Sequence, residues 1–561
     1  MRLKDMNVMK KINNTSRFAI VILLLLTIAC SKKETELALS RQFAPAKISS
    51  TNAETQVSLT WSAALFTIAG DVSYAIEISD KVDDFSNPIY TTTTSDLTVT
   101  ITDETLVIKK NYYARVKAVG KGNTGDSNWL ISSSFRILGE QFLAPVTIDN
   151  VIDKSVRLTW RQSPDLTKIV ITPTAGGTPI EVSLTAADLT AMVKQVDNLA
   201  QKTAYTAEIF AGAKTKGVIP FTTKPSISGN IIDLSGTTGN PGILATTLTT
   251  APSGSVIVLR RGEPYTMSAS FSFGKSLTII SALGFGNNLA TIRMADPSTV
   301  ATTVSFNFVA SSVIDSLVFK DLVIKGGRAN LGGYNADYVF NASNAATITK
   351  IKFDNCTIKV LRGILRLTAT GGGGQVTNFS MNNCLMDSIR EFNIVTAGTS
   401  VIQNIAITNS TLYKARKFIG LTIAGNKSIS ISNCTFNEMV AGVAAATPAN
   451  FFIDLGSTSI NSLPNGISIT NTILGNVWSN EPSTTGPGTV IGGIRAGTQT
   501  PIVVTNTYTT SDFVNTTNPV PGVSAYSGAA TALFTDPSTG NFKIKDSNFV
   551  GKASSGDPRW R

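Results

Sequence analysis

Four arginines recur at one fixed distance after a polar residue in the second half of the chain. Each lies seven residues beyond an Asp or an Asn, and the four are Arg328, Arg362, Arg390 and Arg416. A guanidinium group binds a carboxylate through two parallel hydrogen bonds, so a row of arginines suits an acidic polymer. The other ligand-binding candidates are Arg366 and Lys417, which add positive charge, and Tyr413 and Trp478, which could stack on sugar rings.

An alternative reading of the same arginines is internal charge pairing. Asp387, Glu391 and Asp337 lie close to them in the sequence and could neutralise the row. Exposed ion pairs of this kind contribute little to stability and form an ordinary solvated surface. The sequence leaves both readings open.

The elements that position these arginines belong to a repeat. In each copy apolar residues stand four and two places before a key Asn or Asp, and in all copies but the last another stands three places after it. The key residues are Asp321, Asn355, Asn383, Asn409, Asn433, Asn471 and Asn506. The shortest intervals between them are 24, 26 and 28 residues, which is typical of a solenoid. We expect the Asn side chains to stack from coil to coil, and Cys356, Cys384 and Cys434 to lie in an interior column.

The repeat resembles a right-handed parallel β-helix of the pectin-lyase type over residues 226–561. The segment SGSVIVLRRGEPYTM (253–267) resembles the first coils of such proteins. The ending GDPRWR (556–561) resembles the tail of Bacteroidetes β-helix lipoproteins. We interpret this ending as a cap over the last coil, with Trp560 on exposed apolar surface. The resemblance implies a fold, and fold alone does not determine function.

Pectate lyases of this fold use a basic residue to abstract a proton, together with calcium held by carboxylates. The resemblance therefore implies Arg362 and Arg390 as candidate catalytic bases and Asp387 and Glu391 as candidate calcium ligands. The chain contains no histidine, which excludes Ser-His-Asp chemistry and histidine-ligated zinc. The local motifs of pectate lyases and the aspartate cluster of polygalacturonases are not found in the sequence.

Two segments before the repeat share a β-sandwich pattern, residues 42–138 and 144–224. Each has an alternating strand that ends in a tryptophan, and later a leucine six residues before a tyrosine. These residues are Trp61, Leu106 and Tyr112 in the first copy and Trp160, Leu199 and Tyr205 in the second. The late tyrosine resembles the tyrosine corner of fibronectin type III domains. We therefore predict an all-β chain of two such sandwiches followed by the β-helix.

Residues 1–29 have the pattern of an export signal. Basic residues precede the apolar run FAIVILLLLTIA, which is too short to span a bilayer comfortably. The run ends at Cys30, in a tetrad that resembles the lipobox of bacterial lipoproteins, where the cysteine is acylated. This predicts a lipid-anchored protein of the outer membrane, at the cell surface, with residues 30–41 as a tether. Translation starts at Met1 or Met9.

The basic charge lies wholly in the predicted β-helix once the signal is removed. Residues 226–561 contain 23 Lys and Arg against 16 Asp and Glu, a net charge of +7, whereas residues 30–225 contain 20 of each. For an exported lipoprotein the expected polyanion is an acidic, pectin-like polysaccharide and not a nucleic acid. We therefore predict glycan capture, with other outer-membrane glycan-uptake proteins as possible partners. The alternatives are a divergent calcium-dependent lyase and a structural or adhesive surface protein.

Overall fold

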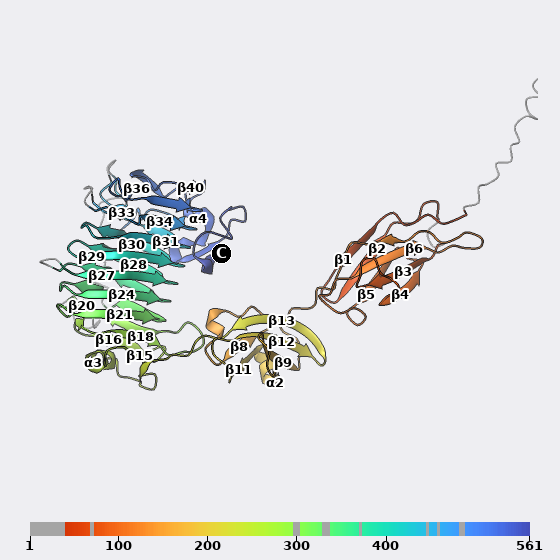
Figure 1. The fold of residues 1–561 in the computed structure, drawn as a ribbon, viewed down its shortest axis with the longest axis horizontal. Coiled ribbons are helices and arrows are strands. Elements are labelled where there is room, and N and C mark those ends of the chain that lie inside the picture. The colour runs from red at the N-terminus through yellow and green to blue at the C-terminus, as the bar shows by residue number, and fades with distance from the viewer. Residues whose placement is uncertain are drawn as a thin grey trace, which may run out of the picture. The chain divides into compact units, whose positions relative to one another are not determined.

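The structure is a computed structural model that describes residues 40–67, 72–294, 303–327, 337–369, 373–444, 448–456, 461–481 and 488–561. The chain is all-β, as predicted, with antiparallel sandwiches followed by a stack of parallel coils (Figure 1). Packing divides it into two compact units. The first unit holds the first sandwich and most of the second. The other unit holds the coils together with residues 146–157 and 195–204.

The first sandwich consists of two antiparallel sheets. One sheet contains β1 (Ile48–Asn52), β2 (Gln56–Trp61) and β5 (Thr98–Thr102), and the other contains β4 (Tyr90–Thr94), β3 (Tyr74–Ser79), β6 (Tyr113–Ala118) and β7 (Leu130–Ile131). Trp61, Leu106 and Tyr112 are buried in the core between them. The Tyr112 hydroxyl accepts a hydrogen bond from the Val107 amide at 3.0 Å, so the predicted tyrosine corner forms here.

The second sandwich has a four-stranded and a two-stranded sheet among the described residues. The larger sheet contains β10 (Ile180–Ser183), β9 (Lys168–Pro173), β12 (Ala204–Ala211) and β13 (Lys214–Thr222), and the smaller one contains β11 (Val193–Val196) and β8 (Val156–Thr159). The short helices are η1 (Ile148–Asn150) and α2 (Ala186–Ala191). The latter begins with a capping box formed by Thr185 and Asp188. Trp160, Leu199 and Tyr205 are buried, as the shared pattern predicts.

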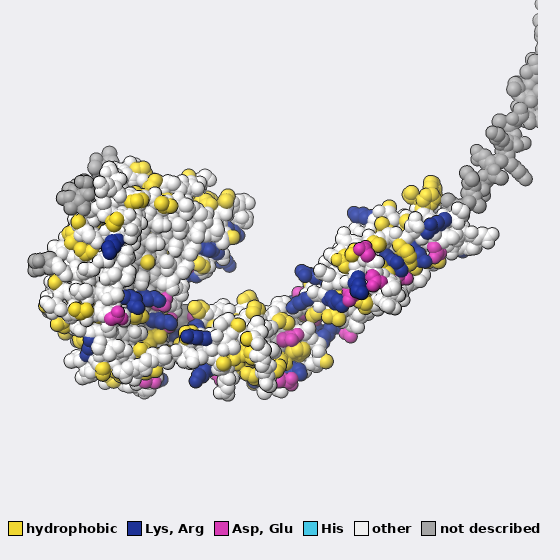
Figure 2. Space-filling view, viewed as in Figure 1, with side chains coloured by type: hydrophobic (Ala, Val, Ile, Leu, Met, Phe, Trp, Pro, Cys, Tyr) yellow, Lys and Arg dark blue, Asp and Glu magenta, His cyan; other side chains and the backbone are white. Residues whose placement is uncertain are grey.

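The first wall of the stacked coils is a parallel sheet of ten strands among the described residues. They are β14 (Asn230–Asp233), β15 (Ser255–Leu259), β18 (Leu277–Ser281), β21 (Val313–Lys320), β24 (Thr347–Asp354), β27 (Gln375–Asn382), β29 (Val401–Thr408), β31 (Ser428–Ser432), β34 (Ile467–Thr470) and β37 (Ile502–Thr505). Leu317, Ile351 and Phe379 are register partners on successive coils, so the repeat aligned from the sequence is the repeat of the fold. On the face seen in Figure 2, Lys and Arg side chains gather over β21 and β24, whereas the later coils carry few charges.

The other walls belong to one continuous parallel sheet. Its described strands are β16 (Pro264–Met267), β17 (Phe271–Phe273), β19 (Ala290–Met294), β20 (Phe306–Phe308), β22 (Leu322–Gly326), β23 (Tyr338–Ala342), β25 (Thr357–Leu361), β26 (Gly363–Leu367), β28 (Leu385–Ala397), β30 (Thr411–Leu421), β32 (Thr435–Met439), β33 (Phe451–Asp454), β35 (Ile473–Leu474), β36 (Val490–Arg495), β38 (Tyr508–Thr509), β39 (Val514–Thr517) and β40 (Ser524–Ala525). Side chains from both sheets fill one long hydrophobic core, which is the arrangement of a parallel β-helix.

The key Asn and Asp of each copy form a turn between the two sheets. All seven have a left-handed backbone, with φ between 45° and 53°, a conformation that Asn and Asp adopt more readily than most other residues. Neighbouring turns are joined by side-chain hydrogen bonds, for example from Asn383 to Asn355 at 2.9 Å. We call this row of turns the Asn ladder. Cys356, Cys384 and Cys434 follow it as free, buried thiols, as predicted for interior residues.

The helix α3 (Ile243–Thr250) packs Leu244 and Leu248 into the core of the first coils. The C-terminal segment contains α4 (Ala530–Leu533), β41 (Phe534–Asp536), η2 (Pro537–Thr539), β42 (Asn541–Ile544) and η3 (Pro558–Trp560). No described helix is long and apolar enough to cross a membrane.

The predicted cap over the last coil is wrong in its placement. The final residues run back along the Asn ladder instead, because Gly556 donates its amide to Asn471, and Arg559 donates to Asn383, on an earlier coil. Trp560 is half-buried, and its indole donates to Thr411 at 2.7 Å. The tail therefore covers the flank of earlier coils.

Candidate functional site

Register places three of the four predicted arginines at equivalent positions. Leu361 of β25, Ile389 of β28 and Ala415 of β30 are partners on successive coils. Arg362, Arg390 and Arg416 each follow one of these residues directly. The predicted stacking of these three residues is therefore present, whereas Arg328 lies outside the described residues.

The side chains of these arginines are paired with carboxylates, which is the second of the two readings that the sequence leaves open. Glu391 is a partner that this reading names, whereas Glu481 is not. Arg390 is 4% exposed, and its Nε lies 2.6 Å from Oε1 of Glu481, a residue that is itself buried. Arg416 lies 4.0 Å from the other oxygen of Glu481. Arg362 forms an ion pair with Glu391. Because a buried guanidinium needs a carboxylate partner, Arg390 serves the packing of the coils and is not reachable by a polymer or as a base.

Two of the predicted sugar-stacking residues are also buried. Tyr413 is 8% exposed and packs against Phe542 of the C-terminal segment, with ring centroids 5.3 Å apart. Trp478 is 4% exposed. Neither ring offers a free face to a sugar, so these two predictions are wrong for a physical reason: other parts of the chain cover them.

The predicted calcium ligands are not brought together as a metal site. Glu391 is bound to Arg362, and Asp387 accepts a hydrogen bond from Ser388 at 2.7 Å. Within the described ranges there is no group of three or more His, Cys, Asp or Glu that could hold a metal ion. The arrangement of Asp387 and Glu391 therefore does not fit a calcium site.

The guanidinium groups of Arg362 and Arg366 both lie over the aromatic ring of Phe392. The guanidinium of Arg366 is 4.3 Å from the ring centroid of Phe392 and that of Arg362 is 5.0 Å from it. Arg366 also donates to Asn341 at 2.9 Å, and no ion pair found among the described residues includes it. Such stacking fixes the orientation of a guanidinium and leaves its edge free for a carboxylate. Both arginines are half-buried.

Lys417 lies beside this group on β30, one position after Arg416. Burial lowers the pKa of Lys417, and Arg416 lowers it further, while Asp454 and Glu391 act in the opposite direction. This half-buried amine has no carboxylate within ion-pair distance in the described part of the chain. Lys417 therefore gives up its proton more readily than an exposed lysine.

A second row of cations lies on the outer face of β19, β22 and β25. Arg293, Lys325 and Lys359 are register partners on three successive coils. We call these three residues the cationic column. They are half-buried, and none of the ion pairs found among the described residues contains any of them. Burial lowers the pKa of Lys325, and Arg293 and Lys359 lower it further.

The residues predicted from the sequence include neither Arg293 nor Phe392. The signal for the column was present, because a lysine stands three residues before Arg328 and before Arg362. No local sequence pattern indicates that the ring of Phe392 contacts guanidinium groups, because the two arginines involved come from the preceding coil.

Comparisons with known proteins match three parts of the chain. Residues 27–128 match the family described as SusE outer membrane protein, which supports an outer-membrane location. Residues 263–415 and 429–560 match two domains of unknown function, DUF4957 and DUF5123. No curated protein matches the chain.

Two of the similar solved structures are chicken proteins. The first consists of the FN1–FN3 domains of chicken CNTN1, with 13% identity, a TM-score of 0.16, and 33% of this chain and 66% of that chain covered. The second is a two-domain fibronectin type III segment of chicken tenascin, with 14% identity, a TM-score of 0.18, and 32% and 99% covered.

Proposed function

We propose that the protein is a lipid-anchored outer-membrane protein whose β-helix captures an acidic, pectin-like polysaccharide. The observation that carries this proposal is the cationic column, three in-register cations that form no ion pair among the described residues, with Asp387 as the register partner of Lys359 on the next coil. Its ligand is a chain of carboxylates that runs along the helix axis.

The spacing of the column explains why a polymer suits it. Neighbouring coils are about 4.8 Å apart, and two like charges about 5 Å apart repel by roughly 0.8 kcal/mol even in water. A polymer with repeated carboxylates relieves this repulsion at each coil. A single small anion would contact only part of the column.

Arg362 and Arg366 supply the second part of the proposed surface. Their contact with Phe392 orients the guanidinium groups, and the ion pair with Glu391 leaves Arg366 as the member without a carboxylate. Because Glu391 neutralises Arg362, we expect Arg366 to contribute more to binding.

The membrane part of the proposal rests on Cys30 and on the family match. Cys30 lies outside the described residues, and its acylation is a proposal from the sequence. The match of residues 27–128 to the SusE outer membrane protein family supports the same location. We include partnership with other outer-membrane glycan-uptake proteins in the proposal on the same basis.

A second candidate function, cleavage of the polymer by a lyase, is favoured by Lys417. The hydrogen bond that Arg362 donates to Glu391 raises the pKa of Arg362. Arg362 therefore holds its proton more tightly and is a poor candidate for the base. Burial instead lowers the pKa of Lys417. In a lyase on this surface, neutral Lys417 would take the proton from the carbon next to the carboxylate. The electron pair of that C–H bond would form a carbon–carbon double bond as the glycosidic C–O bond at the neighbouring carbon breaks, and the leaving oxygen would take a proton from water.

The test separates capture from cleavage in one preparation. The purified protein is run through gels that contain polygalacturonate or its fully methyl-esterified, uncharged form, and unsaturated product is followed by ultraviolet absorbance. Retardation by the charged polymer alone, without product, is the expected result. Product that disappears in Lys417→Met establishes the lyase instead. If neither polymer retards the protein and no product forms, acidic-glycan capture is rejected and an adhesive role becomes the better account.

A further inference from the structure

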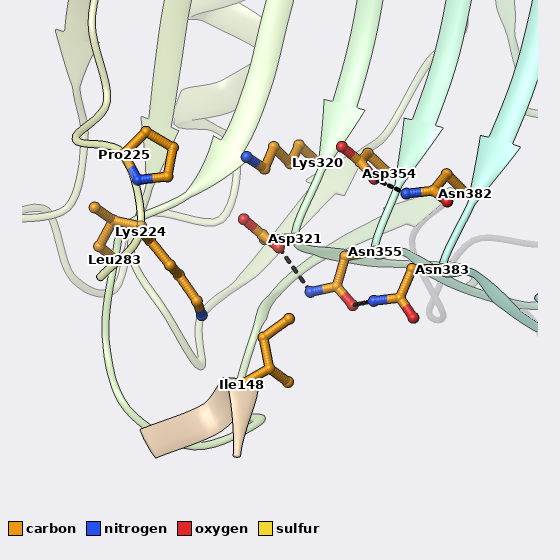
Figure 3. Close-up of a pocket in the computed structure, with 10 residues that line it drawn as sticks. All are labelled: Ile148, Lys224, Pro225, Leu283, Lys320, Asp321, Asp354, Asn355, Asn382 and Asn383. Carbon is orange, nitrogen blue, oxygen red and sulfur yellow. Dashed lines mark hydrogen bonds between the residues drawn. The ribbon is translucent and has the colours of Figure 1, made fainter. Parts of the chain in front are cut away.

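A cavity lies at the start of the Asn ladder (Figure 3). Its volume is about 250 Å³, and its lining includes Lys224, Lys320, Asp321, Asn355 and Asn383. A second cavity of about 330 Å³ shares Ile148, Asn355 and Asn383 with it. The two form a groove along the ladder, which we call the turn groove.

The ladder is polarised along this groove. Arg559 donates to Asn383 at 2.9 Å, Asn383 donates to Asn355 at 2.9 Å, and Asn355 donates to Asp321 at 2.7 Å. The chain of hydrogen bonds thus begins at a cation and ends at a carboxylate. Such chains strengthen each of their members when they lie in a partly buried site.

Asp321 departs from the other six turns, which all carry Asn at this position. An Asn would accept the same hydrogen bond from Asn355 and adopt the same backbone. The carboxylate adds a second acceptor oxygen, which Figure 3 shows directed away from Asn355, toward the side of the cavity with Lys224 and Lys320. The extra charge at this turn is therefore not needed by the ladder.

Two ammonium groups line the same space. None of the ion pairs found among the described residues contains Lys224, Lys320 or Asp321, although all three line one cavity. Burial lowers the pKa of Lys224, while Asp321 and Asp149 act in the opposite direction. Two hydrogen-bond donors, the lysine ammonium groups, and one acceptor, the Asp321 carboxylate, thus line the cavity without forming ion pairs with one another.

The charged side chains that line the cavity determine which class of ligand it can bind. Asp354 also lines the cavity but is paired with Lys352 at 3.0 Å, which leaves two ammonium groups and the Asp321 carboxylate in this cavity. The second cavity adds Asp149 and Arg559, and Arg559 is paired with Asp557. A cation is repelled by both lysines, and an anion is repelled by Asp321. Neighbouring hydroxyl groups satisfy all three, because each hydroxyl accepts one hydrogen bond and donates another. Leu283 and Pro225 supply apolar contact for the ring carbons.

We propose that the turn groove binds an uncharged sugar unit, through a hydroxyl that donates to Asp321 and neighbouring hydroxyls that accept from Lys224 and Lys320. This site is separate from the cationic column and needs no acidic group on the sugar. A glycan with acidic and neutral units could occupy both surfaces.

The test is saturation-transfer NMR on the purified protein with single glycosides. The probes are the methyl glycosides of galactose, xylose, arabinose, rhamnose and glucose, with galacturonate as the charged comparator. At least one neutral glycoside should receive saturation from the protein, at low and at high salt alike. The variant Asp321→Asn should weaken its binding at least tenfold, since it keeps the ladder and removes only the acceptor.

Asp315→Asn is the matched control, because Asp315 lies on the same strand β21, is exposed and does not line the cavity. It should bind like the wild type. The proposal is overturned if no neutral glycoside receives saturation, if only galacturonate does, or if Asp321→Asn binds as well as the control. Failure here leaves gel retardation by polygalacturonate unaffected, so the two proposals fail separately.

Discussion

At the scale of single residues, Glu481 is a buried carboxylate that lies near two arginines of the coils. It lies 1% exposed between Arg390 and Arg416, and it is the carboxylate that permits an arginine inside the coils. Removal of one partner from a buried ion pair typically costs about 3–5 kcal/mol.

We therefore expect Glu481→Gln to destabilise the protein by about 3 kcal/mol or more. The measurement is the shift in the urea unfolding midpoint. The double variant Arg390→Met, Glu481→Gln should regain part of the loss, because it removes the uncompensated charge. A single variant as stable as the wild type would show that the pair does not support the coils.

Glu438 predicts a dependence of stability on pH. Burial raises the pKa of Glu438 above its ordinary 4.5, and Asp387 raises it further, while Lys414 lowers it. Its Oε2 is buried, and no hydrogen-bond partner for it occurs in the described part of the chain. The folded protein thus holds this proton more tightly than the unfolded chain does.

The contribution of Glu438 is therefore fully present below pH 4.5 and is lost as the pH rises through the raised pKa. Glu438→Gln should stabilise the protein more at about pH 7 than at about pH 4. Urea midpoints of both proteins at the two pH values check this. A difference that is the same at both would contradict the assigned direction.

At the scale of elements, the turn of the ladder is the unit that sequence patterns predict well. The alternation of apolar residues and the left-handed Asn are both local, so the register of Asn355, Asn383 and Asn409 could be inferred from spacing alone. The pairing of Arg390 could not, because Glu481 lies 91 residues further along the chain. Likewise Tyr413 is covered by Phe542 of the C-terminal segment, which no local pattern connects to it.

The ladder predicts an order of stability at Asn409. This residue has φ of 49° and donates to Asn382 at 3.0 Å. Asn409→Ala loses the hydrogen bond and replaces asparagine by a residue that adopts the left-handed backbone less readily, at a combined cost of about 1–3 kcal/mol. Asn409→Gly loses only the hydrogen bond and should be the milder change. Melting temperatures in the order wild type, Gly, Ala are expected, and a glycine variant less stable than the alanine one would refute the role of backbone conformation.

At the scale of the whole molecule, the C-terminal tail ties distant coils together. Asp557 is buried and accepts from Thr411 at 2.7 Å, while Arg561 donates to Asn433 at 3.1 Å. Truncation after Gly556 should increase hydrogen exchange in peptides that contain Thr411 and Thr435, because these groups lose their cover. Peptides of the first sandwich serve as the internal control and should not change. Unchanged protection at Thr411 would mean that the tail is not a structural strap.

The central claim, capture of an acidic polysaccharide by the cationic column, is tested most directly by calorimetric titration with polygalacturonate. The wild type is compared with one triple variant, in which Arg293, Lys325 and Lys359 are all replaced by Met. The control is a double variant in which the exposed Lys350 and Lys543 are replaced by Met. We predict that the triple variant binds at least about tenfold more weakly, or about 1.4 kcal/mol, and that added salt weakens wild-type binding. Equal affinities of the triple variant and the control would contradict the claim.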